Sequence, residues 1–124
     1  MTIAYWCILV AGFGVPFLFT IYAKASPDFD NAAPRTYLAS LEGAKLRAYW
    51  SVQNLYETFP LFTAAVIIAH LQEVNQSTLN MIAIAFVVLR ILYGVLYVVN
   101  QSTLRSLVWI GSMACIISLF VLSA

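Results

Sequence analysis

Apolar residues in this chain fall into four long runs that polar segments separate. The runs cover about residues 2–23, 44–71, 79–99 and 104–123. A helix needs roughly 20 apolar residues to cross the hydrocarbon core of a bilayer, and each run has about that length or more. The pattern therefore predicts an all-α membrane protein with four transmembrane helices.

The polar segments between the runs differ in length. The first, residues 24–43, is long and contains prolines and charged residues, while the second and third, residues 72–78 and 100–103, are short turns. Short turns make consecutive helices antiparallel neighbours. We therefore expect a single membrane domain over residues 1–124, folded as an up-down four-helix bundle with one long loop.

Composition supports this interpretation and excludes several kinds of site. The chain is 63% hydrophobic and 9% charged, whereas a soluble domain carries about 25% charged residues. The net charge of +1 creates no strong field that would recruit nucleic acid. Cys7 and Cys115 lie singly in apolar runs, so we expect small buried side chains and neither a disulfide nor a metal site.

The positions of the cations indicate how the chain is oriented. The first loop and its borders hold Lys24, Arg35, Lys45 and Arg47, and Arg105 borders the third loop. Loops one and three share a side in a four-span protein, and loops rich in Lys and Arg stay in the cytoplasm. We expect both loops to be cytoplasmic and both termini to lie outside.

Polar and ionisable residues inside the runs are the candidate site. A charged residue at the centre of a membrane helix costs about 2.5–3.5 kcal/mol, and such residues usually face the bundle interior and mark function. The second run carries Arg47, Asn54 and Glu57 on one helical face. Arg90 and Tyr97 share a face of the third run. These faces predict a polar cleft between the helices.

Depth along the helices places the charges of this cleft. At a rise of 1.5 Å per residue, Glu57 lies about 20 Å from the cytoplasmic start of its helix and Arg90 about 15 Å from the cytoplasmic end of its own. An ion pair between them, within one chain or between subunits, would suit the floor of a cleft for an anionic or zwitterionic ligand. A purely structural interpretation is also open, in which this pair fixes helix register while Arg47 and Arg105 contact lipid phosphates.

Two segments resemble the MAPEG superfamily, the membrane-associated proteins in eicosanoid and glutathione metabolism. They are residues 47–62 (RAYWSVQNLYETFPLF) and residues 30–35 (DNAAPR), which look like the short bacterial branch of that superfamily. The resemblance covers most of the chain. It implies a homotrimer in the bacterial inner membrane, which binds glutathione between protomers near the cytoplasmic side and acts on a small lipophilic substrate.

The resemblance also implies roles for particular residues. Asn54 and Glu57 match an Asn-x-x-Glu pair that contacts glutathione, and Arg105 matches an arginine that stabilises the glutathione thiolate in some members. The binding positions carried over are Arg47, Asn54, Glu57, Arg90, Tyr97 and Ser106. A thiol with a pKa of about 8.5 is mostly protonated at neutral pH, and a fixed arginine favours the reactive thiolate by charge and hydrogen bonding. Arg105 is therefore the candidate catalytic residue.

Three functions follow from these observations. The first is a glutathione-dependent transferase or peroxidase. The second is a non-catalytic accessory subunit with a vestigial site. Trp50 to Gln53 favour it, since they stand where well-studied members carry further cations, whereas the retention of Arg105 disfavours it. The third is a small proton-coupled multidrug exporter, which is disfavoured because such exporters carry their glutamate on the first helix.

Overall fold

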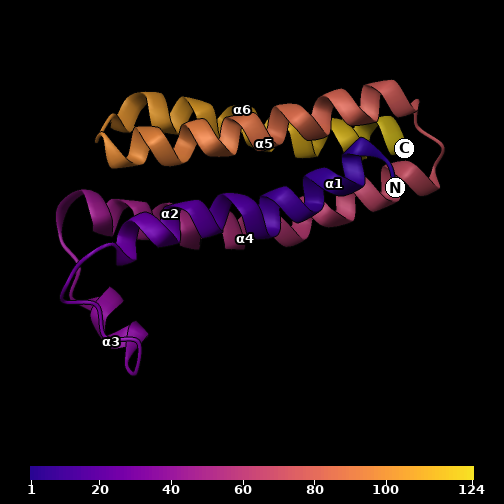
Figure 1. Cartoon of the computed structure of the whole chain (residues 1–124). Coiled ribbons are helices and arrows are strands. Elements are labelled where there is room, and N and C mark those ends of the chain that lie inside the picture. Colours follow the sequence, from indigo (N-terminus) through magenta and orange to yellow (C-terminus); the bar gives the residue numbers. More distant parts are fainter.

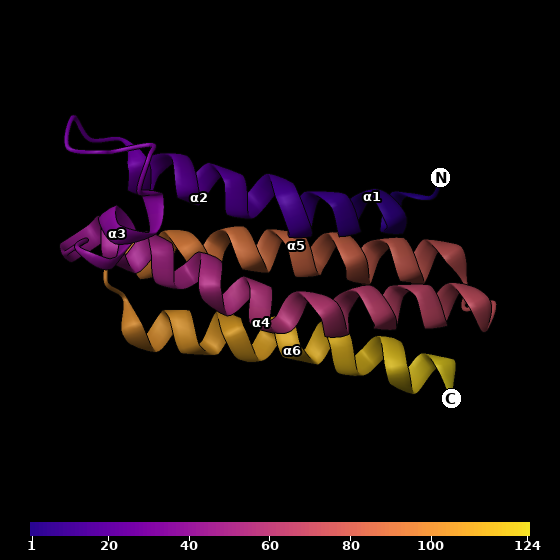
Figure 2. The same cartoon turned by 90° about the horizontal axis from the view of Figure 1, so that it is seen from below.

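The structure, a computed structural model, describes residues 1–124 and consists of helices joined by short connections. In chain order the elements are α1 (Ile3–Leu9), the π-helical turn η1 (Val10–Gly14), α2 (Val15–Lys24), α3 (Pro34–Ala39), α4 (Gly43–Leu71), α5 (Gln76–Val98) and α6 (Ser102–Ser123). The first three run on as one continuous rod, which makes four long rods with α4, α5 and α6. Figures 1 and 2 show these rods lying side by side, with both termini at the same end. The predicted helical class is confirmed, and the predicted bounds differ from these by a few residues.

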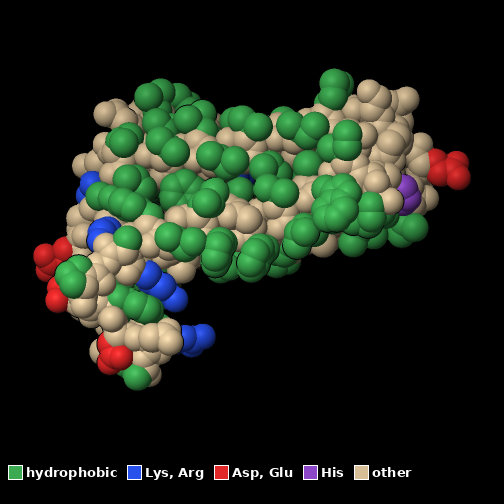
Figure 3. Space-filling view, viewed as in Figure 1, with side chains coloured by type: hydrophobic (Ala, Val, Ile, Leu, Met, Phe, Trp, Pro, Cys, Tyr) green, Lys and Arg blue, Asp and Glu red, His purple; other side chains and the backbone are tan.

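Three of the rods are long and apolar enough to cross a membrane. They are Ile3–Lys24, Gln76–Val98 and Ser102–Ser123. The remaining rod, α4, is longer at 29 residues but more polar, because it contains Lys45, Arg47 and Glu57. Figure 3 shows hydrophobic side chains along the flank of the bundle and charged ones gathered mainly at its two ends. This distribution is that of an integral membrane protein.

The first rod changes its hydrogen-bond pattern halfway along. Its start is capped by Thr2, whose Oγ1 accepts a hydrogen bond from the Tyr5 backbone N–H at 3.3 Å. The turn η1 ends two residues before Pro16, which has no backbone N–H to donate. A Cβ on Gly12 would lie 2.3 Å from the ζ carbon of Phe59, so this ring packs directly on the glycine backbone. The π-helical turn thus lies beside both Pro16 and the contact with Phe59.

The core lies along the axis of the bundle. Phe62 of α4 and Phe86 of α5 stack with their ring centroids 3.9 Å apart. Small side chains let the backbones approach around this pair, and those that are fully buried include Ala4, Ala11, Ala65, Ala69 and Ala83. The polar residues of the site lie toward one end of this core.

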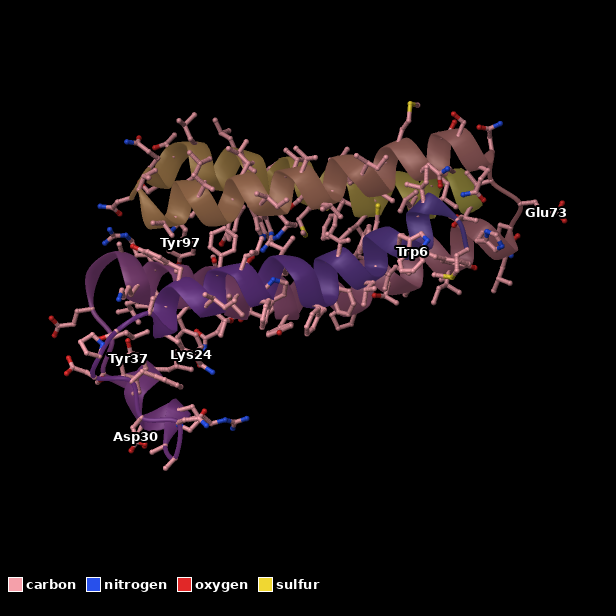
Figure 4. All side chains as sticks on the ribbon, in the orientation of Figure 1. Trp6, Lys24, Asp30, Tyr37, Glu73 and Tyr97 are labelled. Carbon is pink, nitrogen blue, oxygen red and sulfur yellow. The ribbon has the colours of Figure 1, made fainter.

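Residues 25–42 form a compact segment at that end of the bundle. The Tyr37 hydroxyl donates a hydrogen bond to the Ala23 carbonyl at 3.0 Å, and Lys45 Nζ donates to the Ala25 carbonyl. Figure 4 shows Tyr37 between the end of the first rod and the part of the segment that carries Asp30. The predicted polar loop thus contains the short helix α3, which begins at Pro34, a residue favoured in the first helical turn.

Candidate functional site

The candidate site lies where α4, α5 and α6 meet, near the end that carries residues 25–42. Two adjoining cavities of about 380 and 410 Å³ open there, and both are lined by Asn54 and Tyr93. The first, here called the α6 cavity, is completed by Arg105, Ser106, Trp109 and Ile110. The second, here called the α4 cavity, is completed by Trp50, Gln53, Glu57 and Tyr97. Asn54 and Tyr93 thus form the wall that the two cavities share.

The α6 cavity is polar at one end and apolar at the other. Arg105 and Ser106 begin the polar end, and Trp109 and Ile110 follow one helical turn later on the same face of α6. The Arg105 guanidinium carbon lies 4.1 Å from the ring centroid of Tyr97, a cation–π geometry that restrains the side chain. This cavity can accommodate an anionic group beside an apolar one.

The α4 cavity carries the opposite charge. Glu57 is exposed on α4 within this chain, as are Trp50 and Gln53. The indole of Trp50 lies near the ring of Tyr97, with centroids 6.2 Å apart. A carboxylate on the flank of a membrane bundle is costly unless a protein group or a ligand covers it. Glu57 is therefore suited to a cationic group.

Arg90 is buried behind the wall between the cavities. Its side chain is 2% exposed, and its Nη2 donates a hydrogen bond to Asn54 Oδ1 at 2.7 Å. The predicted ion pair with Glu57 does not form within the chain, because Glu57 projects outward from α4 while Asn54 faces α5. Pairing between subunits stays a prediction.

Arg47 lies outside both cavities. Its Nε and Nη2 donate to the carbonyls of Tyr97 and Val98 at distances of 3.0 to 3.3 Å. These carbonyls belong to the last turn of α5, where the ordinary helical partners run out, and the Tyr97 carbonyl also accepts a hydrogen bond from the Asn100 backbone N–H at 3.1 Å. Arg47 thus joins α4 to the end of α5, although the sequence suggested that it binds a ligand.

The structure therefore brings together most of the predicted site. Five of the predicted residues line the cavities: Asn54, Glu57, Tyr97, Arg105 and Ser106. The other five lining residues were not among the predicted site residues: Trp50, Gln53, Tyr93, Trp109 and Ile110. The position of Trp109 one turn after Arg105 is a signal that the sequence contains. Arg90 and Arg105 together carry two positive charges and Glu57 one negative charge. The site therefore has one net positive charge, which suits a ligand with a net negative charge.

Comparison with known proteins gives one match. A family model described as "MAPEG family" matches residues 3–124, and this range includes every residue that lines the two cavities. No curated protein and no solved structure matches the chain.

Proposed function

The chain belongs to the MAPEG family, and from this premise we propose that it is a glutathione-dependent transferase or peroxidase acting on small lipophilic electrophiles. The observation that carries the proposal is the pair of adjoining cavities. One holds Arg105 beside an apolar wall, the other holds Glu57, and Asn54 lies between them. We further place the protein in a bacterial inner membrane, with loops one and three in the cytoplasm and both termini outside.

The charges of the cavities match those of glutathione. This tripeptide carries two carboxylates and one ammonium at neutral pH, and therefore a net negative charge. In the proposed complex Glu57 receives the ammonium, while Asn54 and Tyr97 contact the peptide. The thiol then lies in the α6 cavity near Arg105, because this is the cavity with a cation at its polar end.

Arg105 supplies the chemistry in this proposal. Its guanidinium stabilises the thiolate, and the Ser106 hydroxyl can donate a hydrogen bond to the same sulfur. In the transferase reaction the thiolate attacks an electrophilic carbon and forms a C–S bond, while a leaving group or an opened ring takes the electron pair. Trp109 and Ile110 provide the apolar surface on which an electrophile from the bilayer would rest.

We also propose that the protein is a homotrimer in which α4 is the fourth transmembrane helix. The polar face of α4 supports this, because Gln53, Tyr56 and Glu57 are all exposed within a single chain. A neighbouring copy would shield these groups from lipid. The length of α4 and its place beside α2, α5 and α6 support a full crossing of the membrane.

One observation favours a second candidate function, that of a non-catalytic accessory subunit. The Arg47 guanidinium is hydrogen-bonded to carbonyls of α5 and does not reach the cavities. Residues 50–53 contain no cation that could serve the α4 cavity. Fewer positive groups are then left for the two carboxylates of glutathione. A subunit with a vestigial site would keep the fold without the activity.

Glutathione binding by the purified protein tests the proposal. Saturation at 100 times the dissociation constant stabilises a protein by about 2.7 kcal/mol, which thermal shift detects, and calorimetry gives the affinity. We expect a clear shift for the native protein, a weaker one for Arg105→Ala, and no change for Arg35→Ala in α3, outside both cavities. Absence of any shift at millimolar glutathione would contradict the proposal and favour the accessory role.

A further inference from the structure

A buried contact joins the three helices of the site behind the wall between the two cavities. Arg90 of α5 donates through Nη2 to Asn54 Oδ1 of α4 at 2.7 Å, and its Nη1 lies 3.5 Å from Ser112 Oγ of α6. Arg90 is 2% exposed and Ser112 is fully buried. Asn54 is only half-buried, since its side chain also lines both cavities.

The chemistry of this contact determines which way the Asn54 amide points. A guanidinium has only N–H donors and no acceptor, whereas an asparagine amide has one acceptor oxygen and one NH₂ donor. Only the oxygen of Asn54 can therefore face Arg90. The NH₂ group, with its two hydrogens, is left on the side of the cavities.

The surroundings of Arg90 keep the guanidinium in place. Ser112 donates its own hydroxyl hydrogen to the Trp109 carbonyl at 2.8 Å, which leaves its oxygen as an acceptor for Arg90. The ring of Tyr93 lies 4.2 Å from the guanidinium carbon, and Arg90 Nε has no partner. If the Asn54 amide were flipped, its NH₂ group would face the N–H groups of Arg90. Both groups are donors, and buried donors without acceptors are costly.

We propose that Arg90 is a positioning residue, which orients the Asn54 amide so that its N–H donors select a hydrogen-bond acceptor on the ligand. The acceptor is a carboxylate or a peptide carbonyl that lies at the wall between the α4 and α6 cavities. With glutathione as the ligand this inference rests on the proposed function. Arg90 does not contact the ligand in this proposal. It affects ligand affinity only through the orientation of Asn54.

A double-mutant cycle on ligand affinity tests this dependence. The variants are Asn54→Ala, Arg90→Met and the double variant, and the probe is S-methylglutathione, a thioether that keeps the peptide groups without the ionisable thiol. We expect each single change to weaken binding about tenfold or more and the double variant to bind no more weakly than Asn54→Ala. Losses that multiply in the double variant would show a direct effect of Arg90 and overturn the proposal.

Two conservative variants separate positioning from general damage to the fold. Asn54→Asp keeps an oxygen acceptor for Arg90 but has no N–H donor, so it should keep the thermal stability of the native protein and lose affinity for the probe. Arg90→Gln keeps a donor that can face Asn54 without the charge, so it should retain more affinity than Arg90→Met. Native affinity in Asn54→Asp would overturn the proposal.

Thermal unfolding without ligand tests the contact even if the proposed function fails. Asn54→Leu should lower the unfolding temperature when Arg90 is present and change it little in the Arg90→Met background. Equal effects in both backgrounds would overturn the orienting contact. A native protein that does not bind the probe yet shows this coupling would refute glutathione binding alone and support the orientation of Asn54 for another acceptor ligand.

Discussion

Glu57 is the only carboxylate that lines the two cavities, and at the scale of single residues it offers a direct test of charge recognition. Glu57→Gln keeps the shape of the side chain and removes its charge. We expect glutathione affinity to fall about tenfold or more, because hydrogen bonds to charged groups contribute about 1.5–3 kcal/mol, and calorimetry measures this.

The control for this change is Glu73→Gln, in the turn between α4 and α5 at the opposite end of the bundle. It should leave the affinity unchanged. Native affinity in Glu57→Gln would show that this carboxylate does not receive the ammonium. In an exporter the same change would instead abolish proton-coupled drug transport.

Close backbone packing at Gly94 predicts a stability effect. A Cβ at this position would lie 2.2 Å from the ζ carbon of Phe19, so Gly94→Ala forces the ring to move and should lower stability by about 1–3 kcal/mol. Thermal unfolding in detergent measures the loss. The smaller side chain in Phe19→Leu should restore part of it.

Gly14→Ala is the matched control, because the nearest side-chain atom to its added Cβ, Val10 Cγ1, is 3.7 Å away. It should be neutral or stabilising by up to about 1 kcal/mol, since alanine favours helix more than glycine does. Equal losses for the two alanine variants would show that contact with Phe19 is not the cause.

Half of the ten residues that line the cavities could be predicted from the sequence, but their pairing could not. Asn54 and Glu57 lie three positions apart and therefore project about 60° apart around α4. Which of the two meets Arg90 depends on the rotation of α4 against α5, and packing of the whole bundle sets that rotation. The sequence favoured Glu57 because of its charge, and the structure brings Asn54 to Arg90 instead.

At the scale of elements, the long helices follow directly from hydropathy. Apolar runs and short turns gave their bounds to within a few residues. The turn η1 could not be predicted, because it depends on contacts of the first rod with α4 as well as on Pro16. The short helix α3 could not be predicted either, since its six residues carry little periodic pattern.

The contact between α1 and α5 predicts the effect of a change at Asn80. Its Oδ1 accepts hydrogen bonds from the Ala4 backbone N–H at 3.0 Å and from Gln76 Nε2 at 2.7 Å. Asn80→Leu leaves the buried Ala4 N–H without a partner, which should cost about 1–3 kcal/mol. Thermal unfolding measures this loss, and hydrogen exchange should become faster at the start of α1.

Asn31→Leu, in the exposed segment between α2 and α3, provides the comparison for Asn80. It should change neither the unfolding temperature nor exchange in α1. Unchanged exchange at Ala4 in Asn80→Leu would show that the first rod does not depend on this contact.

At the scale of the whole molecule, the exposed polar face of α4 predicts association. Cross-linking of the purified protein in mild detergent should give species of up to three protomers and no larger ones. Glu57→Gln should lower the yield of the cross-linked trimer, because Glu57 lies on this face. A clean dimer would contradict the homotrimer.

The hydrogen bond between Arg90 and Asn54 has a consequence for biogenesis. The central Arg90 opposes partitioning of α5 from the translocon into lipid by about 2.5–3.5 kcal/mol. The helix before it, α4, is more polar than the three helices that are apolar enough to cross a membrane. The helices are joined by residues 72–75 alone, so they can leave the translocon together as a hairpin in which Asn54 already satisfies Arg90. In the proposed arrangement, with α4 as a fourth transmembrane helix, integration of α4 should therefore wait for synthesis of α5. A nascent chain that ends before α5 should then fail to retain α4 in the bilayer, which carbonate extraction of truncated chains would measure.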